Sequence, residues 1–262
     1  MIAHRTAGMM FRGAATMAMG AMVVAAPAAG QEPRSPVRVE LELEGGSVWL
    51  SRNTAQIPND DSGTRFSLVS VTGKGPWPAA RGYVTWNMNE RHGLRVLVAP
   101  LSIRETGTLA SSIQFAGASY APGAPVDAEY TFNSYRLTYR YRLREAARTS
   151  AWVGFTAKVR DATIALEQGA TSSRKDDVGF VPLLHLAGEW RMTPRWLATA
   201  DADALAGGPG RAEDVAVKLG FRATPRLSFH AGYRMVEGGA DVPSTYSFAW
   251  LHFAVASVRW RP

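Results

Sequence analysis

The sequence contains no cysteine in 262 residues, so no disulfide bond can stabilise the fold and no cysteine is available for lipid attachment. Charges are also few. Asp, Glu, Lys and Arg make up 19% of the chain, whereas hydrophobic residues make up 46%, and this balance excludes a disordered or polyelectrolyte chain. Beyond the N-terminal segment, no stretch shows a sustained helical period. The chain must therefore be held together by packing of other elements or by a membrane.

The N-terminus has the pattern of a secretory signal peptide. Arg5 and Arg12 precede residues 13–24, which are small or apolar apart from one threonine. This run is shorter than the ~20 residues that a spanning helix needs, which disfavours an uncleaved anchor. The small-residue rule allows cleavage at two places, after Ala28 and after Gly30. We therefore expect export, with a signal peptide over residues 1–30 and one mature domain over residues 31–262.

The formal charge is +7, with a sequence pI near 10.0. A basic exported protein meets anionic lipid head groups or polysaccharide rather than nucleic acid. The sequence also lacks the interleaved aromatic and basic residues of a nucleic-acid-binding module. Nucleic acid is therefore excluded as a partner.

The mature chain repeats a period of two, which is the signature of strands with unlike faces. Its clearest example is "YRLTYRYRLR" over residues 135–144. Ten runs share the pattern, over residues 37–51, 83–88, 94–103, 130–143, 151–164, 180–190, 196–205, 215–221, 227–235 and 248–260. On average the runs are roughly ten residues long, which matches the ~9 to 11 residues that a tilted strand needs to cross a hydrocarbon core.

The connections between these runs alternate in length. "REAARTS", "RMTPRW" and "RATPRL" are short, whereas residues 105–129, "EQGATSSRKDDVG" and "EGGADVPSTY" are long. Short turns on one rim and long loops on the other are typical of outer-membrane barrels, where the short turns are periplasmic. The sequence predicts an all-β fold, a transmembrane antiparallel up-and-down barrel. We expect ten strands, within a range of eight to twelve. Residues 63–71 and 111–117 could be two further strands, which would give twelve, or hairpin extensions above the membrane, which would give ten.

In such a barrel the alternating side chains face lipid and lumen in turn, because every backbone group must pair within a closed sheet. Tyr135, Leu137 and Tyr139 would face lipid. We predict that the charged residues of the opposite phase pair inside the lumen. This predicted network comprises Glu40, Glu42, Glu44, Arg136, Arg140, Arg142, Lys158, Arg160, Glu189, Arg222 and Arg234.

The C-terminal segment "GYRMVEGGADVPSTYSFAWLHFAVASVRWRP" is similar to the closing hairpin of small bacterial outer-membrane β-barrel proteins. The outward residues of its last strand resemble the signal that the barrel-assembly machinery reads, although Arg261 and Pro262 follow the final aromatic residue. The resemblance implies an outer-membrane location and contact with outer-membrane lipids and with the assembly machinery. We also expect a monomer. It implies no catalytic residues.

Two residues have an unexpected phase. Trp152 and His252 each fall on the wrong side of their strand, so we expect a bulge or an interfacial position for both. Tryptophans at strand ends form the aromatic girdle of a membrane interface, and Trp190, Trp196 and Trp260 are the predicted interface aromatics.

The weak catalytic candidates are His185, Asp201 and Asp203, which share the inward phase of adjacent strands. Outer-membrane proteases pair Asp with His to activate water, and outer-membrane lipid hydrolases pair Ser with His. An interior charge network is the favoured interpretation of these three residues. The acids and histidines are otherwise dispersed, so we expect no metal site and no cofactor.

Three functional classes remain open. The favoured one is a structural or ligand-binding barrel with a charge-filled interior and no catalysis. A narrow pore is the second, and a surface hydrolase acting on lipid or peptide is the third.

Overall fold

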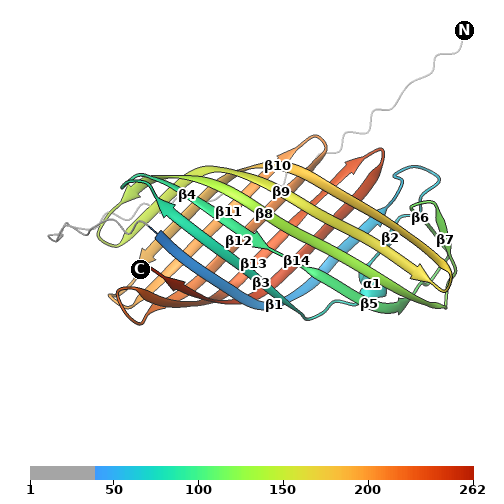
Figure 1. Ribbon diagram of the computed structural model, residues 1–262, viewed down its shortest axis with the longest axis horizontal. Coiled ribbons are helices and arrows are strands. Elements are labelled where there is room, and N and C mark those ends of the chain that lie inside the picture. Colours follow the sequence, from blue (N-terminus) through green and yellow to red (C-terminus); the bar gives the residue numbers. More distant parts are fainter. Residues whose placement is uncertain (1–38) are drawn as a thin grey trace, which may run out of the picture. The chain divides into compact units, whose positions relative to one another are not determined.

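The period of two seen in the sequence becomes a closed barrel of ten antiparallel strands in the computed structural model, which describes residues 39–262 (Figure 1). The predicted signal peptide lies outside the described residues. The barrel strands are β1 (Val39–Gln56), β3 (Trp77–Asn87), β4 (His92–Ala99) with its continuation β5 (Ser102–Thr108), β8 (Pro125–Glu145), β9 (Thr149–Gln168), β10 (Thr171–Arg191), β11 (Trp196–Gly207), β12 (Gly210–Arg222), β13 (Leu227–Val242) and β14 (Thr245–Trp260). β14 pairs with β1 from Leu41↔Trp260 to Gln56↔Tyr246, which closes the sheet. The predicted fold class and strand number are confirmed.

β4 and β5 occupy one position in the barrel, and both pair with β8. The ladder stops at Ala99↔Ser134 and resumes at Ser102↔Thr131. Pro100 lies in the gap, and proline has no N–H to donate to a ladder. A single predicted strand over residues 94–103 is therefore two strands in one line.

The connections at the two rims of the barrel differ in part from the predicted alternation of short turns and long loops. We call the rim that holds Val39 and Trp260 the terminal rim and the opposite one the distal rim. The connections predicted to be long after β9 and β13 are strand extensions, because the ladders continue to Thr171↔Gln168 and Val242↔Thr245. That part of the loop prediction is wrong. Polar side chains stay hydrated on both faces of a hairpin that rises into water, so the sequence of such a hairpin resembles that of a loop.

Two long connections remain at the distal rim, over residues 57–76 and 109–124. The first contains β2 (Phe66–Ser67) and α1 (Val69–Thr72), and the second contains the hairpin of β6 (Ile113–Phe115) and β7 (Ala118–Tyr120). β2 adds to the end of β1, and β6 pairs only with β7. Residues 63–71 and 111–117 are therefore not two further barrel strands. Within residues 39–262, no helix has the length and apolar character needed to cross a membrane.

The outer face of the barrel is apolar. Leu137 is 49% exposed and Phe155 is 66% exposed, while their neighbours Arg136 and Thr156 are buried. Such a surface would not be stable in water and is suited to hydrocarbon. The predicted interface aromatics lie on this outer face at the terminal rim, where Trp190, Trp196 and Trp260 are all exposed.

Candidate functional site in the barrel interior

The lumen is filled by two layers of side chains of different chemistry. The layer on the terminal side, here called the charged tier, consists of His185 and ionic side chains from barrel strands: Glu40, Glu42, Glu44, Arg81, Arg95, Arg136, Glu189, Asp201, Asp203, Asp214, Lys218, Arg234 and Arg259. The layer on the distal side, the apolar tier, is one hydrophobic cluster that includes Val48, Leu50, Phe66, Leu68, Leu101, Ile103, Phe115, Tyr120, Val126, Tyr130, Val236, Leu251 and Phe253.

Asp214 is the centre of the charged tier. Its carboxylate accepts hydrogen bonds from Arg81 at 2.8 Å, Arg136 at 2.7 Å and Arg234 at 2.5 Å. Arg81 on β3 and Arg136 on β8 reach Asp214 on β12 across the lumen, whereas Arg234 reaches it from the neighbouring strand β13. Charge-assisted bonds of this kind are the strong ones, and three guanidinium groups satisfy one carboxylate. Asp214 is 3% exposed.

Glu44 on β1 is a second centre beside it. Arg234 donates to Glu44 at 3.0 Å, and Lys218 Nζ donates at 2.9 Å. Arg81 lies 3.8 Å away. Because Arg234 and Arg81 contact both Glu44 and Asp214, the two centres form one network.

The network continues toward the terminal rim through Arg259. This side chain donates to Glu42 at 3.0 Å and lies 3.7 Å from Glu189. Arg261 beyond it donates to Glu40 at 2.6 Å. The predicted acids of β1 and β10 therefore lie in the lumen beside Arg259 of the last strand and Arg261 just after it.

The other predicted network residues have different surroundings. Arg140 lies over the Trp152 ring at 4.9 Å, and no ion pair is recorded for it among residues 39–262. Arg142 lies over the same ring and 3.5 Å from Glu145. Trp152 thus points inward beneath two guanidinium groups.

Three further predicted residues lie outside the centre of the network. Lys158 is buried in the lumen with its ammonium over the Phe132 ring at 5.0 Å. Arg160 pairs with Asp177 nearer the distal rim. Arg222 ends β12 at the terminal rim.

Sequence reasoning missed several members of the network, above all Asp214 and Arg81. Asp214 lies just before the predicted run over residues 215–221, and Arg81 lies just before the run over residues 83–88. The inward phase of β12 passes through Asp214, Ala216 and Lys218. Extending the alternation by one residue would therefore have found this carboxylate.

The weak catalytic candidates lie together in the charged tier. His185 Nδ1 is 2.8 Å from Asp203 Oδ1, which also accepts a hydrogen bond from Thr156 at 2.9 Å. Arg136 donates to the other oxygen of Asp203 at 2.8 Å, and Arg95 donates to both oxygens of Asp201.

The same three residues could offer ligands to a metal, because one ligand atom of each lies within 4.8 Å of the others. However, the guanidinium groups of Arg95 and Arg136 already neutralise both carboxylates, and a cation would have to displace them. His185 is fully buried, and nothing in the described part of the chain pairs with its Nε2. The cluster is therefore arranged as a structural network, closed to substrate.

The apolar tier is hydrophobic, so the prediction of a charge-filled interior is wrong for the distal side of the lumen. Leu50 and Leu251 are 1% and 0% exposed and face each other across the β1–β14 ladder. The two distal connections fold against this layer, and Phe66 meets Phe115 edge to face with centroids 5.7 Å apart. Within a single strand, the inward-facing side chains change from charged on the terminal side to apolar on the distal side.

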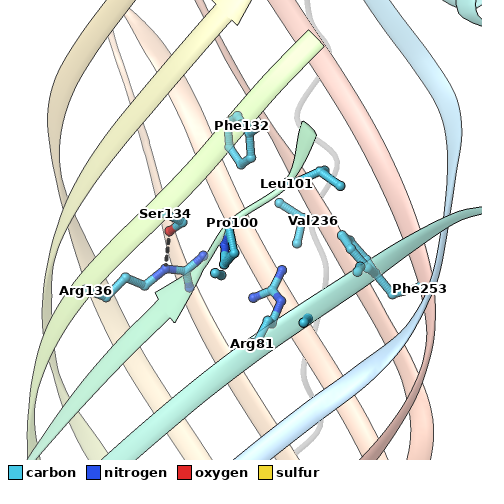
Figure 2. A pocket seen from close by; sticks show the side chains of 11 residues that line it. Arg81, Pro100, Leu101, Phe132, Ser134, Arg136, Val236 and Phe253 are labelled. Carbon is cyan, nitrogen blue, oxygen red and sulfur yellow. Dashed lines mark hydrogen bonds between the residues drawn. The ribbon is translucent and has the colours of Figure 1, made fainter. Parts of the chain in front are cut away.

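A small cavity of about 20 Å³ marks the boundary between the tiers (Figure 2). Leu101, Phe132 and Phe253 line its apolar side, and Arg81 and Arg136 line the charged side. Arg136 Nε donates to Ser134 at 3.0 Å there. The space suffices for about one water molecule, so it is too small to be a binding site for an organic ligand.

The sequence matches no protein-family model and no curated protein. Solved structures are similar in fold. The outer membrane protease OmpT of Escherichia coli superposes with a TM-score of 0.52 at 10% identity, over 88% of this chain and 98% of that one.

Two more structures align with lower scores. The translocator domain of the autotransporter NalP from Neisseria meningitidis has a TM-score of 0.43 at 8% identity, over 87% of this chain and 90% of that one. The attachment invasion locus protein Ail of Yersinia pestis has a TM-score of 0.38 at 11% identity, over 85% of this chain and 99% of that one. The chain has the fold of the bacterial outer-membrane β-barrel proteins.

Proposed function

We propose that the protein is an outer-membrane barrel with a sealed lumen, which has a structural or ligand-binding role and conducts no solute. The observation that carries this proposal is the ion-pair network around Asp214, which joins four strands across the lumen. Asp214 and Glu44 are 3% and 1% exposed, and Leu251 in the layer above is fully buried. The charged tier and the apolar tier lie one after the other along the lumen, so they leave no continuous path for water.

A narrow pore is the alternative that this arrangement disfavours. Water-filled porins use 16 or more strands, whereas a ten-stranded barrel leaves a lumen that side chains can nearly fill. Opening a path here would break buried ion pairs and expose buried carboxylates and guanidinium groups. A hydrolase centred on His185 is disfavoured because no substrate can reach a fully buried imidazole.

Location and partners belong to the same proposal. The outward side chains of the last strand, Ala254, Ala256, Val258 and Trp260, all lie exposed on the lipid-facing side. They support contact with outer-membrane lipids and recognition by the barrel-assembly machinery. The interior is filled within one chain, which supports a monomer as the working unit.

The test uses one preparation of the refolded mature chain. Heat-modifiable migration on a gel checks that the barrel has formed, and single-channel conductance in a planar bilayer checks the seal. We expect migration that depends on heating, and no conductance steps. Steady conductance by folded protein would contradict the sealed lumen and favour the pore.

A further inference from the structure

Three polar side chains form a hydrogen-bonded chain on the outer face of the barrel. Ser51 Oγ lies 2.9 Å from His252 Nε2, and His252 Nδ1 lies 2.5 Å from the Tyr233 hydroxyl. The residues come from the adjacent strands β1, β14 and β13. Tyr233 is 49% exposed and Ser51 is also exposed, so the chain of bonds faces the surroundings of the barrel.

A β-bulge presents the serine. The β1–β14 register shifts between Leu50 and Arg52, which makes Ser51 the extra residue. Leu50 and Asn53 are buried in the lumen, so Ser51 and Arg52 both belong to the outward stretch between them. Bulges leave a residue unpaired in the ladder and re-aim side chains, and they are frequent beside active sites.

Aromatic side chains surround these hydrogen bonds on the outer face of the barrel. Trp49 and Trp250 flank them on the outer face and are 37% and 38% exposed. The Trp250 ring stacks on the His252 ring with centroids 5.5 Å apart. Aromatic residues of this kind mark the boundary between hydrocarbon and head groups, where the acyl esters of membrane lipids lie.

Basic groups lie on the distal side of the serine. Arg52 donates to the Tyr246 hydroxyl at 2.7 Å, and the Arg65 guanidinium lies 3.8 Å from the centre of the Tyr246 ring. In the described chain, no carboxylate is recorded as a partner of either arginine. Two guanidinium groups without a carboxylate partner among the described residues suit a phosphate.

A second His–Tyr pair lies at the terminal rim and can be compared with His252 and Tyr233. His92 Nδ1 lies 2.6 Å from the Tyr139 hydroxyl on the outer face. This pair has the same chemistry as His252 and Tyr233, but no serine side chain is recorded beside it among residues 39–262. Interfacial anchoring explains a His–Tyr pair but does not explain the added serine on a bulge.

We infer that Ser51, His252 and Tyr233 form a site that hydrolyses acyl esters of phosphorylated membrane lipids. This inference goes beyond the sealed-barrel function, which concerns only the lumen. Serine is a weak nucleophile unless a base takes its proton, and a third group that orients the base completes the arrangement. In the productive form, Ser51 donates to His252 Nε2, and His252 Nδ1–H donates to Tyr233.

The reaction balances with water as the second substrate. Ser51 Oγ attacks the carbonyl carbon of the ester while His252 Nε2 takes the hydroxyl proton. The ester C–O bond then breaks, and His252 returns the proton to the leaving alcohol. Water, activated by the same imidazole, cleaves the acyl-serine, which releases a fatty acid and restores Ser51. The alternative bond from Ser51 to the Trp250 carbonyl, at 3.3 Å, is given up in the productive form.

The experiment measures fatty-acid release by mass spectrometry from the folded mature barrel, in vesicles of phosphatidylglycerol and in vesicles containing lipopolysaccharide. Release from either supports the site and identifies the source of the ester. We expect Ser51→Ala and His252→Ala each to lower release at least about 100-fold, the lower end of what a general base contributes. His92→Ala is the matched control and should release fatty acid at the wild-type rate.

A second measurement is independent of mutant folding. A fluorophosphonate probe should label the wild-type protein at Ser51, as shown by mass spectrometry of the modified peptide. Absence of both labelling and release in wild-type protein that migrates as a folded barrel would overturn the inference. Full release by Ser51→Ala would overturn it too. Conductance is measured separately, so failure here does not decide whether the lumen is sealed.

Discussion

The charged tier and the apolar tier fill the same lumen in different ways. All residues of the charged tier come from barrel strands, whereas the apolar tier also takes Phe66, Leu68, Phe115 and Tyr120 from the distal connections. Arginine and glutamate side chains are long enough to meet across the lumen. Leucine and valine are shorter, so a lumen lined by them needs inserted segments to reach the packing density of a protein core.

The tiers also differ in how a single substitution should act. In the charged tier, removal of one partner leaves opposite charges buried without compensation. In the apolar tier, truncation leaves a cavity whose cost depends on how far the inserted segments collapse into it. Substitutions in the two tiers should therefore differ in the size and in the origin of their effect on stability.

Asp214→Ala should have the largest effect. It leaves Arg81, Arg136 and Arg234 facing one another without their shared carboxylate. We expect the free energy of unfolding to fall by about 5 kcal/mol, the upper end for a broken buried pair. Urea unfolding in detergent micelles followed by tryptophan fluorescence measures it.

The control for this change is Asp176→Ala in the exposed β10 extension. Asp176 pairs with Arg174, and both side chains are more than half exposed. The loss should stay below about 1 kcal/mol. Equal effects of the two aspartate substitutions would show that the charged tier is not a dry network.

Leu251→Ala probes the apolar tier. Leu251 is fully buried against β1, and its truncation should cost about 3 kcal/mol through lost transfer energy and a cavity. Leu219→Ala on the lipid face is the matched control, because Leu219 is 48% exposed and lipid or detergent refills the space. A smaller loss for Leu251 than for Leu219 would contradict a packed apolar tier.

The strand pattern could be predicted because inward and outward phases differ in polarity over most of the terminal side. The inward Glu40, Glu42 and Glu44 are separated by outward leucines. Further along β1, Val48, Trp49 and Leu50 are all apolar, although Trp49 faces outward and its neighbours face the lumen. Alternation of polarity disappears there, so the apolar tier left no signal in the sequence.

The partners within the network could not be predicted. Arg136 and Asp214 are 78 positions apart and belong to non-adjacent strands. Their contact depends on strand number, tilt and stagger, which together set the height of each side chain in the lumen. The Ser51 bulge was hidden for a related reason, because a one-residue shift in register is visible only once the partner strand is known.

Arg140→Leu tests whether an arginine without an ion pair contributes less to stability than an ion-paired one. The sequence predicts equal roles for Arg136 and Arg140, but Arg140 lies over Trp152 with no recorded ion pair in the described chain. Loss of a cation–π contact and relief of an unpaired, partly buried charge oppose each other, so we expect a change within about 1 kcal/mol. Arg136→Leu is the comparison and should cost about 3 to 5 kcal/mol. Similar losses for both arginines would show that Arg140 is ion-paired after all.

Removal of the β6–β7 hairpin should leave conductance unchanged. Replacing residues 110–122 with a short Gly–Ser linker deletes Phe115 and Tyr120 from the apolar tier, which should weaken that tier. The charged tier beneath it consists of strand side chains alone, so planar-bilayer recordings should still show no steps. The full-length barrel is the control. Steady conductance after the deletion would assign the seal to the apolar tier, and the ion-pair network would then be a scaffold that water can pass. No conductance after the deletion means that the β6–β7 hairpin is not needed to block the lumen.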